Sequence, residues 1–203
     1  MADALASKHA NAKAGTLELV VFLINFLTGF VALAYFVMIA AATRQHFTAE
    51  KYPVGMHLIS LLSLIGVSVF MAHAFLWTVN APAAVLTLFM TAFALFLWAA
   101  KHSKDTQLGL AFADDVKSDN IITSGPWQYF RHPFYVSYIL FWLACAWGTL
   151  HLTSIVVFAA LLFIYIYSAL REEAALKAGQ HADTYIAYSK KTGLIFPKRT
   201  AKN

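Results

Sequence analysis

The chain has 203 residues, of which 60% are hydrophobic and 12% are Asp, Glu, Lys or Arg, and its mean hydropathy is +0.63. Soluble domains are about 45–50% apolar and about 25% charged, so this composition excludes a soluble globular enzyme and a disordered chain. The formal net charge of +5 is interpreted as basic residues that flank membrane spans, and no nucleic-acid partner is expected.

The membrane spans are predicted from stretches that contain no charged residue. Three such stretches have 25, 49 and 39 residues, and they end before Arg44, Lys101 and Arg171. Because a hydrocarbon core of ~30 Å needs about 20 helical residues, the first stretch crosses the bilayer once and each of the others crosses it twice. The turns are expected at Asn80–Pro82 and Gly148–His151. The predicted fold is an all-α integral membrane bundle of five transmembrane helices, at about 17–43, 54–79, 82–100, 133–149 and 152–170.

The basic residues predict the orientation of this bundle. Thirteen of the 15 Lys and Arg lie on the side that holds the 44–53 loop, the 101–132 loop and the C-terminal tail, and only Lys8 and Lys13 lie on the other side. By the positive-inside rule, the N-terminus is expected outside and the C-terminus in the cytoplasm.

One membrane domain is predicted. Residues 1–16 are rich in Ala and Lys and are expected to form a mobile tail, whereas residues 17–203 form a single domain. The only cysteine, Cys145, lies in an apolar run and is interpreted as an apolar filler. It excludes a disulfide framework and a Cys-based zinc site, and no metal site is predicted.

A first candidate for chemistry is the segment before the fourth predicted helix, which runs GPWQYFRHPFY over residues 125–135. Its second proline suits the first turn of a helix, where free N–H groups and the helix dipole favour a bound anion. Arg131 adds a fixed cation, and His132 adds a hydrogen-bond donor or acceptor. The same residue types also anchor membrane proteins at headgroup depth, and the residues alone leave both interpretations open.

A second candidate is Arg171-Glu172-Glu173, at the end of the fifth predicted helix. Acidic residues oppose the dipole at a helix C-terminus, so the helix is expected either to continue past the bilayer or to bind a cation there. A pair of Glu173 with Lys177, four residues on, explains Glu173 better than Glu172. Together the two candidates suit a zwitterionic, adenine-bearing cofactor or a phospholipid headgroup.

These segments resemble the isoprenylcysteine carboxyl methyltransferase and phospholipid methyltransferase family of integral membrane enzymes. The shared pattern is the 125–135 segment, two membrane helices, EEAAL at 172–176, a pair of tyrosines at 185 and 188, and GLIFP at 193–197. The resemblance covers about 114–197, which would be the cofactor-binding part of the domain.

The resemblance implies S-adenosylmethionine as the cofactor and methyl transfer to a lipophilic acceptor at the membrane–cytosol interface. The implied cofactor-binding residues are Asn120, Ile121, Ile122, Trp127, His132, Pro133, Phe134, Tyr135 and Glu172. The implied catalytic residues are Arg131 and Arg171, which would hold a carboxylate of the cofactor or an anionic acceptor, and Glu173. An amine acceptor would need a general base, for which Glu173 and His132 are the candidates.

Other functions stay open on the sequence. Membrane reductases of the sterol and steroid type share a related C-terminal motif and use NADPH, and a non-catalytic lipid-binding protein is a further alternative. The acceptor is undetermined among carboxylates, amines and thiols, as is the oligomeric state. His57 and His73, inside the second predicted span, are candidates for a substrate path.

Overall fold

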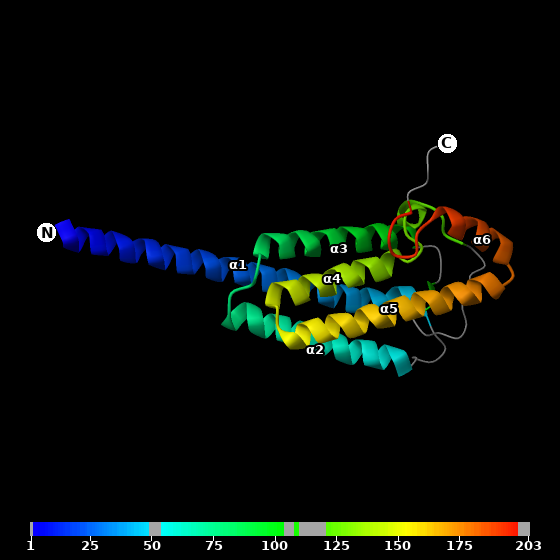
Figure 1. The fold of residues 1–203 in the computed structure, drawn as a ribbon, viewed down its shortest axis with the longest axis horizontal. Coiled ribbons are helices and arrows are strands. Elements are labelled where there is room, and N and C mark those ends of the chain that lie inside the picture. Colours follow the sequence, from blue (N-terminus) through cyan, green and yellow to red (C-terminus); the bar gives the residue numbers. More distant parts are fainter. Residues whose placement is uncertain (1, 49–53, 104–107, 110–120, 199–203) are drawn as a thin grey trace.

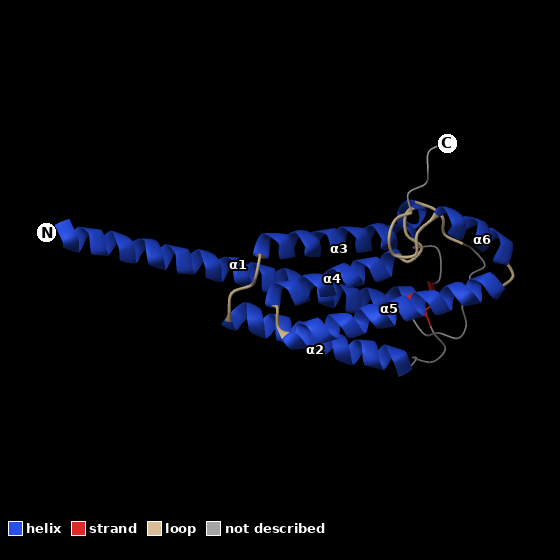
Figure 2. Ribbon diagram, in the orientation of Figure 1, coloured by secondary structure: helices blue, strands red, loops and turns tan. Residues whose placement is uncertain are grey.

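The computed structural model describes residues 2–48, 54–103, 108–109 and 121–198. These residues form a bundle of long helices that lie side by side (Figures 1 and 2). The elements in chain order are α1 (Ala2–His46), β1 (Phe47–Thr48), α2 (Val54–Leu76), α3 (Pro82–His102), β2 (Leu108–Gly109), the 3₁₀ helix η1 (Gly125–Gln128), α4 (Pro133–Thr149), α5 (Leu152–Ala178) and α6 (Ala182–Lys191). The two short strands pair in parallel.

The predicted all-α membrane bundle is confirmed. Among the described residues, four helices are long and apolar enough to cross a bilayer, namely α1, α2, α3 and α5. The chain is therefore a multi-pass membrane protein. Helix α4 has 17 residues, which extend about 25 Å at 1.5 Å per residue and fall short of a hydrocarbon core of ~30 Å. The count of five spans thus stays a prediction that depends on α4.

The N-terminal segment is helical. Helix α1 begins at Ala2 and continues without a break into the first apolar stretch, and the mobility expected of residues 1–16 stays a prediction. The physical reason is that this segment is rich in Ala, contains no proline, and extends a helix that the membrane span has already nucleated. The first part of α1 projects beyond the rest of the bundle, away from α6 (Figure 1), and all side chains from Asn11 to Val20 are exposed.

Two helices end at other residues than the predicted spans do. Helix α2 ends at Leu76 instead of near residue 79, because the next residues form a turn whose backbone is bound by Asn25 of α1. The Asn25 amide donates to the Trp77 carbonyl (2.9 Å), and its oxygen accepts from the Val79 N–H (3.2 Å). Helix α5 continues to Ala178 instead of ending near residue 170, as expected if it extends past the bilayer.

The two predicted turns between spans are confirmed at the end of the bundle opposite α6. Ala81 takes the left-handed conformation (φ 44°), and Pro82 then opens α3. The N–H of Asn80 donates to the carbonyl of Gly148 (2.8 Å) in the turn between α4 and α5. Each turn thereby satisfies part of the other's backbone, as is required where water is scarce.

Helix α4 lies inside the bundle and contacts α2, α3 and α5. The side chain of Tyr35 from α1 packs edge-on against Phe96 of α3 and Phe141 of α4, with ring centroids 6.3 and 5.0 Å apart. Gly66 lets α2 approach closely, because a Cβ there would lie 2.7 Å from the Trp142 ring. This packing holds α4 rigidly, and α4 begins at the residues that the sequence singles out for chemistry.

Candidate functional site

The site lies at the end of the bundle that carries α6, where α4 begins and the last turns of α5 pass beside it (Figure 1). A tight turn leads into it. Gly125 has a positive φ of 61°, and a Cβ there would lie 2.6 Å from the His102 ring, so this position requires glycine. Trp127 is buried in η1 and packs edge-on against Phe134, with the ring centroids 5.9 Å apart.

The C-terminal segment is bound across the start of α4. The backbone N–H of Arg131 donates to the Gly193 carbonyl (2.8 Å), that of His132 to the Leu194 carbonyl (3.3 Å), and that of Gly193 to the Tyr129 carbonyl (3.2 Å). These bonds form a short parallel bridge between Phe130 and Gly193. The backbone N–H groups of Arg131 and His132, just before α4, are therefore occupied by the chain itself.

Arg131 and Glu173 form the centre of an ionic cluster, which consists of Arg131, His132, Glu172, Glu173 and Lys177. The Arg131 Nε donates to Glu173, and the two side chains are 11% and 5% exposed. Arg131 Nη1 donates to the carbonyls of Ser189 (3.0 Å) and Thr192. The predicted pair of Glu173 with Lys177 is confirmed at 3.0 Å. Arg131 thus ties α5 and the end of α6 to the start of α4.

Glu172 is the more open carboxylate of the two. The hydroxyl of Tyr135 donates to Glu172 Oε1, and His132 Nδ1 lies 3.4 Å from Oε2, yet the Glu172 side chain is still 25% exposed. The other nitrogen of His132, Nε2, lies 3.8 Å from Glu173 Oε1, beyond hydrogen-bonding distance. This Nε2 is buried and has no hydrogen-bond partner among the described residues. The cluster therefore presents one carboxylate and one unsatisfied imidazole nitrogen.

The floor of the site is a stack of aromatic rings. The His132 ring lies parallel to that of Tyr135 (centroids 5.5 Å apart, 12° between planes), and Tyr135 stacks in turn on Tyr165 of α5 (5.5 Å, 19°). Tyr138 packs against Tyr165 at 5.6 Å. These rings separate the ionic cluster from the apolar interior of the bundle.

The charge on His132 links the site to pH. Burial lowers the pKa of His132, whereas the nearby carboxylates of Glu172 and Glu173 raise it. The effect of the carboxylates is the larger one, so this pKa lies above its ordinary value of 6.5. A histidine whose pKa is raised by folding stabilises the folded state fully below its unfolded pKa of about 6.5, and this contribution disappears as the pH rises through the folded pKa.

We therefore expect the unfolding midpoint temperature in detergent to be higher near pH 6 than near pH 9. One kcal/mol of lost stability corresponds to roughly 2–4 °C in a chain of this size. The measurement is a thermal melt across this pH range for the wild type and for His132→Gln, which lacks the titrating group. Identical pH slopes for the two proteins would show that His132 is not the source.

The structure brings together five of the residues predicted from the sequence, namely Arg131, His132, Tyr135, Glu172 and Glu173. Three others are buried neighbours that support them, namely Trp127, Pro133 and Phe134. Ile121 and Ile122 are half-buried and precede the turn at Gly125, whereas Arg171 is exposed on α5. Asn120 lies outside the described residues.

Helix α6 supplies two residues that were not among the predicted site residues, Tyr185 and Tyr188. The Tyr188 hydroxyl donates to the Trp127 carbonyl (2.7 Å), and burial raises the pKa of Tyr188 to about 12, so it stays protonated. Tyr185, one helical turn earlier, is buried. The available signal was their spacing of three residues, which puts both rings on one face of a helix.

The two histidines of α2 do not join the cluster. His73 Nε2 lies 3.2 Å from the Thr78 carbonyl, and its ring packs against Trp77, at the opposite end of the bundle. His57 is exposed near the start of α2. The prediction that they line a substrate path stays untested.

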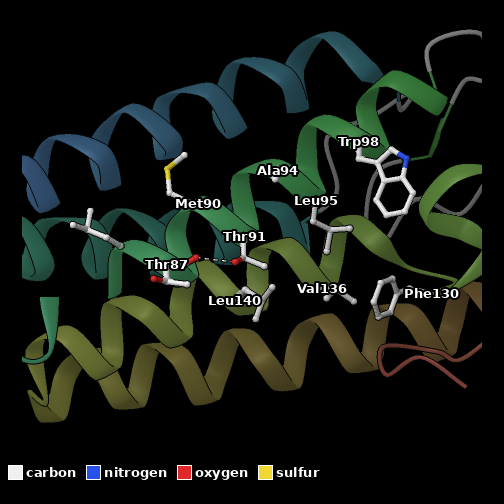
Figure 3. Close-up of a pocket in the computed structure, with 10 residues that line it drawn as sticks. Thr87, Met90, Thr91, Ala94, Leu95, Trp98, Phe130, Val136 and Leu140 are labelled. Atoms are coloured by element: carbon white, nitrogen blue, oxygen red, sulfur yellow. Dashed lines mark hydrogen bonds between the residues drawn. The ribbon is translucent and has the colours of Figure 1, made fainter. Parts of the chain in front are cut away.

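A groove of about 840 Å³ runs along the outside of the bundle between α3 and α4 (Figure 3). Its lining is almost entirely apolar and ends at the turn before α4. The residues that line it are Leu86, Thr87, Met90, Thr91, Ala94, Leu95, Trp98, Phe130, Val136 and Leu140.

The fold and the site define a multi-pass α-helical membrane protein with a buried ionic cluster at one end of its bundle. Comparison with curated proteins finds no match. Residues 17–192 match a family described as a protein of unknown function (DUF1295), and the chain belongs to this family. The match includes the bundle from the first apolar stretch onward and nearly all of the site.

Proposed function

We propose that the protein is a methyltransferase that uses S-adenosylmethionine and acts on a lipophilic acceptor where the membrane meets the cytosol. The observation that carries the proposal is the partly exposed carboxylate of Glu172, which Tyr135 and His132 hold in place. A fixed carboxylate at the rim of a buried aromatic site is suited to a cationic ligand group.

The residues present suit the amino-acid end of such a cofactor. Glu172 would accept hydrogen bonds from its ammonium group, and the unpartnered Nε2 of His132 would donate to its carboxylate. Arg131 and Glu173 bind each other as well as the chain around them. We therefore propose that these two residues, which the resemblance placed among the catalytic ones, position the site and do not touch the reacting atoms.

Methyl transfer from S-adenosylmethionine requires mainly that the protein position the two reactants. S-adenosylmethionine supplies a methyl group that is already activated by the positive sulfur. The chain then needs to orient the acceptor and to exclude water. The stacked rings of His132, Tyr135 and Tyr165 provide a dry floor for this purpose.

The exposed carboxylate of Glu172 favours this cofactor over NADPH. A dinucleotide brings several phosphate charges, and the group that faces outward here is a carboxylate. A phosphate placed next to the Glu172 carboxylate would be repelled by it. The guanidinium of Arg131 could not offset this repulsion, because it is already bound to Glu173 and to two backbone carbonyls. The reductase function is therefore kept only as an outcome of the test.

We further propose that α4 is the fifth span and that the site faces the cytoplasm. Because α4 packs against α2, α3 and α5, its short length exposes little polar backbone to lipid. The described basic residues after residue 170 all lie at the site end of the bundle, namely Arg171, Lys177, Lys190, Lys191 and Lys198. The positive-inside rule then puts the C-terminus inside and the N-terminus outside.

Calorimetric titration of the detergent-purified protein with S-adenosylmethionine tests the proposal. We expect binding by the wild type and a loss of about tenfold or more in Glu172→Gln, which corresponds to about 1.4 kcal/mol or more from one charged hydrogen bond. Asp183→Asn is the matched control, because Asp183 is an exposed acidic residue on α6.

NADPH is titrated in parallel. Binding of NADPH in place of the methyl donor would replace the proposal by the reductase function. Binding of neither cofactor to folded protein would favour the non-catalytic lipid-binding function. Equal affinity of the wild type and Glu172→Gln for S-adenosylmethionine would contradict the proposed site.

A further inference from the structure

The groove between α3 and α4 has the character of a hydrocarbon binding site. Its two threonines do not offer free hydroxyls, because Thr87 donates to the Ala83 carbonyl and Thr91 to the Thr87 carbonyl, each at 2.8 Å. The side chains between them and the turn are apolar, as Figure 3 shows for Leu95, Val136 and Leu140. A chain of methylene groups is the ligand that loses least on leaving lipid for such a surface.

The length of the groove matches one leaflet of a bilayer. On α3 its lining runs from Leu86 to Trp98, which is about 18 Å at 1.5 Å per residue. One half of a hydrocarbon core of ~30 Å is about 15 Å. The groove is closed at the site end by Trp98 and Phe130, and Trp98 packs against Tyr129 at 6.0 Å. Aromatic residues of this kind mark the depth of the headgroups.

The groove ends beside the candidate site. Phe130 forms its end wall and is followed directly by Arg131 and His132 of the ionic cluster. The backbone of Phe130 pairs with Gly193, so that the same short segment borders the groove on one side and the cluster on the other. A lipid in the groove thus has its polar end beside the residues assigned to the cofactor.

We propose that this groove holds the hydrocarbon chain of the methyl acceptor. The inference rests on the proposed function and narrows its substrate class. The acceptor is a lipid of the cytoplasmic leaflet with a chain long enough to span that leaflet, and the group that receives the methyl lies at the turn that carries His132. Short, water-soluble acceptors leave the groove empty and are poor substrates.

Photolabelling in phosphatidylcholine nanodiscs tests the groove directly. The probe is palmitate with a diazirine in its chain, and the labelled peptides are identified by mass spectrometry. We expect the label to concentrate on the groove residues of α3 and α4. Thr91→Trp fills the groove and should reduce this labelling by about tenfold, as a steric block does. Ala94→Phe is a second, milder block.

The matched control is Leu97→Trp, which adds the same bulk to α3 at an exposed position outside the groove lining. It should label as the wild type does. Labelling spread evenly over α1, α2 and α5, or an equal loss in Thr91→Trp and Leu97→Trp, would overturn the proposal in favour of bulk lipid.

A second readout separates the groove from the proposed function. The affinity for S-adenosylmethionine should be the same in Thr91→Trp as in the wild type, because no groove residue belongs to the cofactor set. If the wild type binds no S-adenosylmethionine, the proposed function fails, whatever the labelling shows. If it binds the cofactor and the groove is not labelled, the groove proposal alone fails.

Discussion

Arg131→Ala is expected to lower the free energy of unfolding by about 3–5 kcal/mol, which is the usual effect of breaking a buried ion pair from one side. The substitution leaves Glu173, whose side chain is 5% exposed, with Lys177 at 3.0 Å and His132 at 3.8 Å as its remaining ionic partners. It also removes the donor to the carbonyls of Ser189 and Thr192. Denaturant titration in detergent, followed by circular dichroism, measures the change.

The double variant Arg131→Met, Glu173→Leu distinguishes the ion pair from general damage. Replacing both charges by apolar groups of similar size removes the uncompensated carboxylate, so the double variant should be more stable than Arg131→Ala. Arg131→Lys should be intermediate, because an ammonium cannot reproduce the fork that reaches Glu173 and two carbonyls at once. A loss below about 1 kcal/mol in Arg131→Ala would be typical of a surface pair and would contradict this role.

Gly193→Ala is expected to have the second-largest effect. An added Cβ would collide with the backbone carbonyl of Phe196, so the segment after α6 must move. That movement breaks the bonds from the N–H groups of Arg131 and His132 to the carbonyls of Gly193 and Leu194. We expect a loss of roughly 1–3 kcal/mol of stability, as for an overpacked position, and weaker binding of S-adenosylmethionine because His132 is no longer held.

The control is Gly179→Ala, which makes the same change between α5 and α6. A Cβ at Gly179 would lie 3.4 Å from the nearest backbone oxygen, which is an ordinary contact. It should leave stability and binding close to those of the wild type. Equal effects of the two substitutions would show that Gly193 has no special place in the site.

The spans could be predicted because charge and length decide them. Stretches without charged residues located four helices that are long and apolar enough to cross a bilayer, and Pro82 and Pro133 marked the starts of α3 and α4 correctly. The early end of α2 could not be predicted, since it depends on Asn25, which is 52 residues away from Trp77 in the chain. Helical periodicity carries no signal for such a contact.

For the candidate site, the sequence singled out segments that the structure brings together, but it did not predict most of their contacts. The motif at 125–135 and the pair Glu172-Glu173 indicated the right region, and the spacing of four residues predicted the Glu173–Lys177 pair. The bonds of Arg131 to Glu173 and to two backbone carbonyls join segments 42 to 61 residues apart. The resemblance, which implies a catalytic role for Arg131, therefore does not predict that this side chain joins α4, α5 and α6.

The long first helix has a consequence for the membrane itself. Asn25 is level with the turn that ends α2, yet hydrophobic residues continue before it to Leu19, which is exposed. From Leu19 to Ala42 the helix extends about 36 Å, more than a hydrocarbon core of ~30 Å can cover if α1 is upright. Such hydrophobic mismatch is relieved by tilt or by local thickening of the bilayer. The thickness of the bilayer therefore affects how α1 is accommodated, and a thicker membrane covers more of its exposed hydrophobic surface.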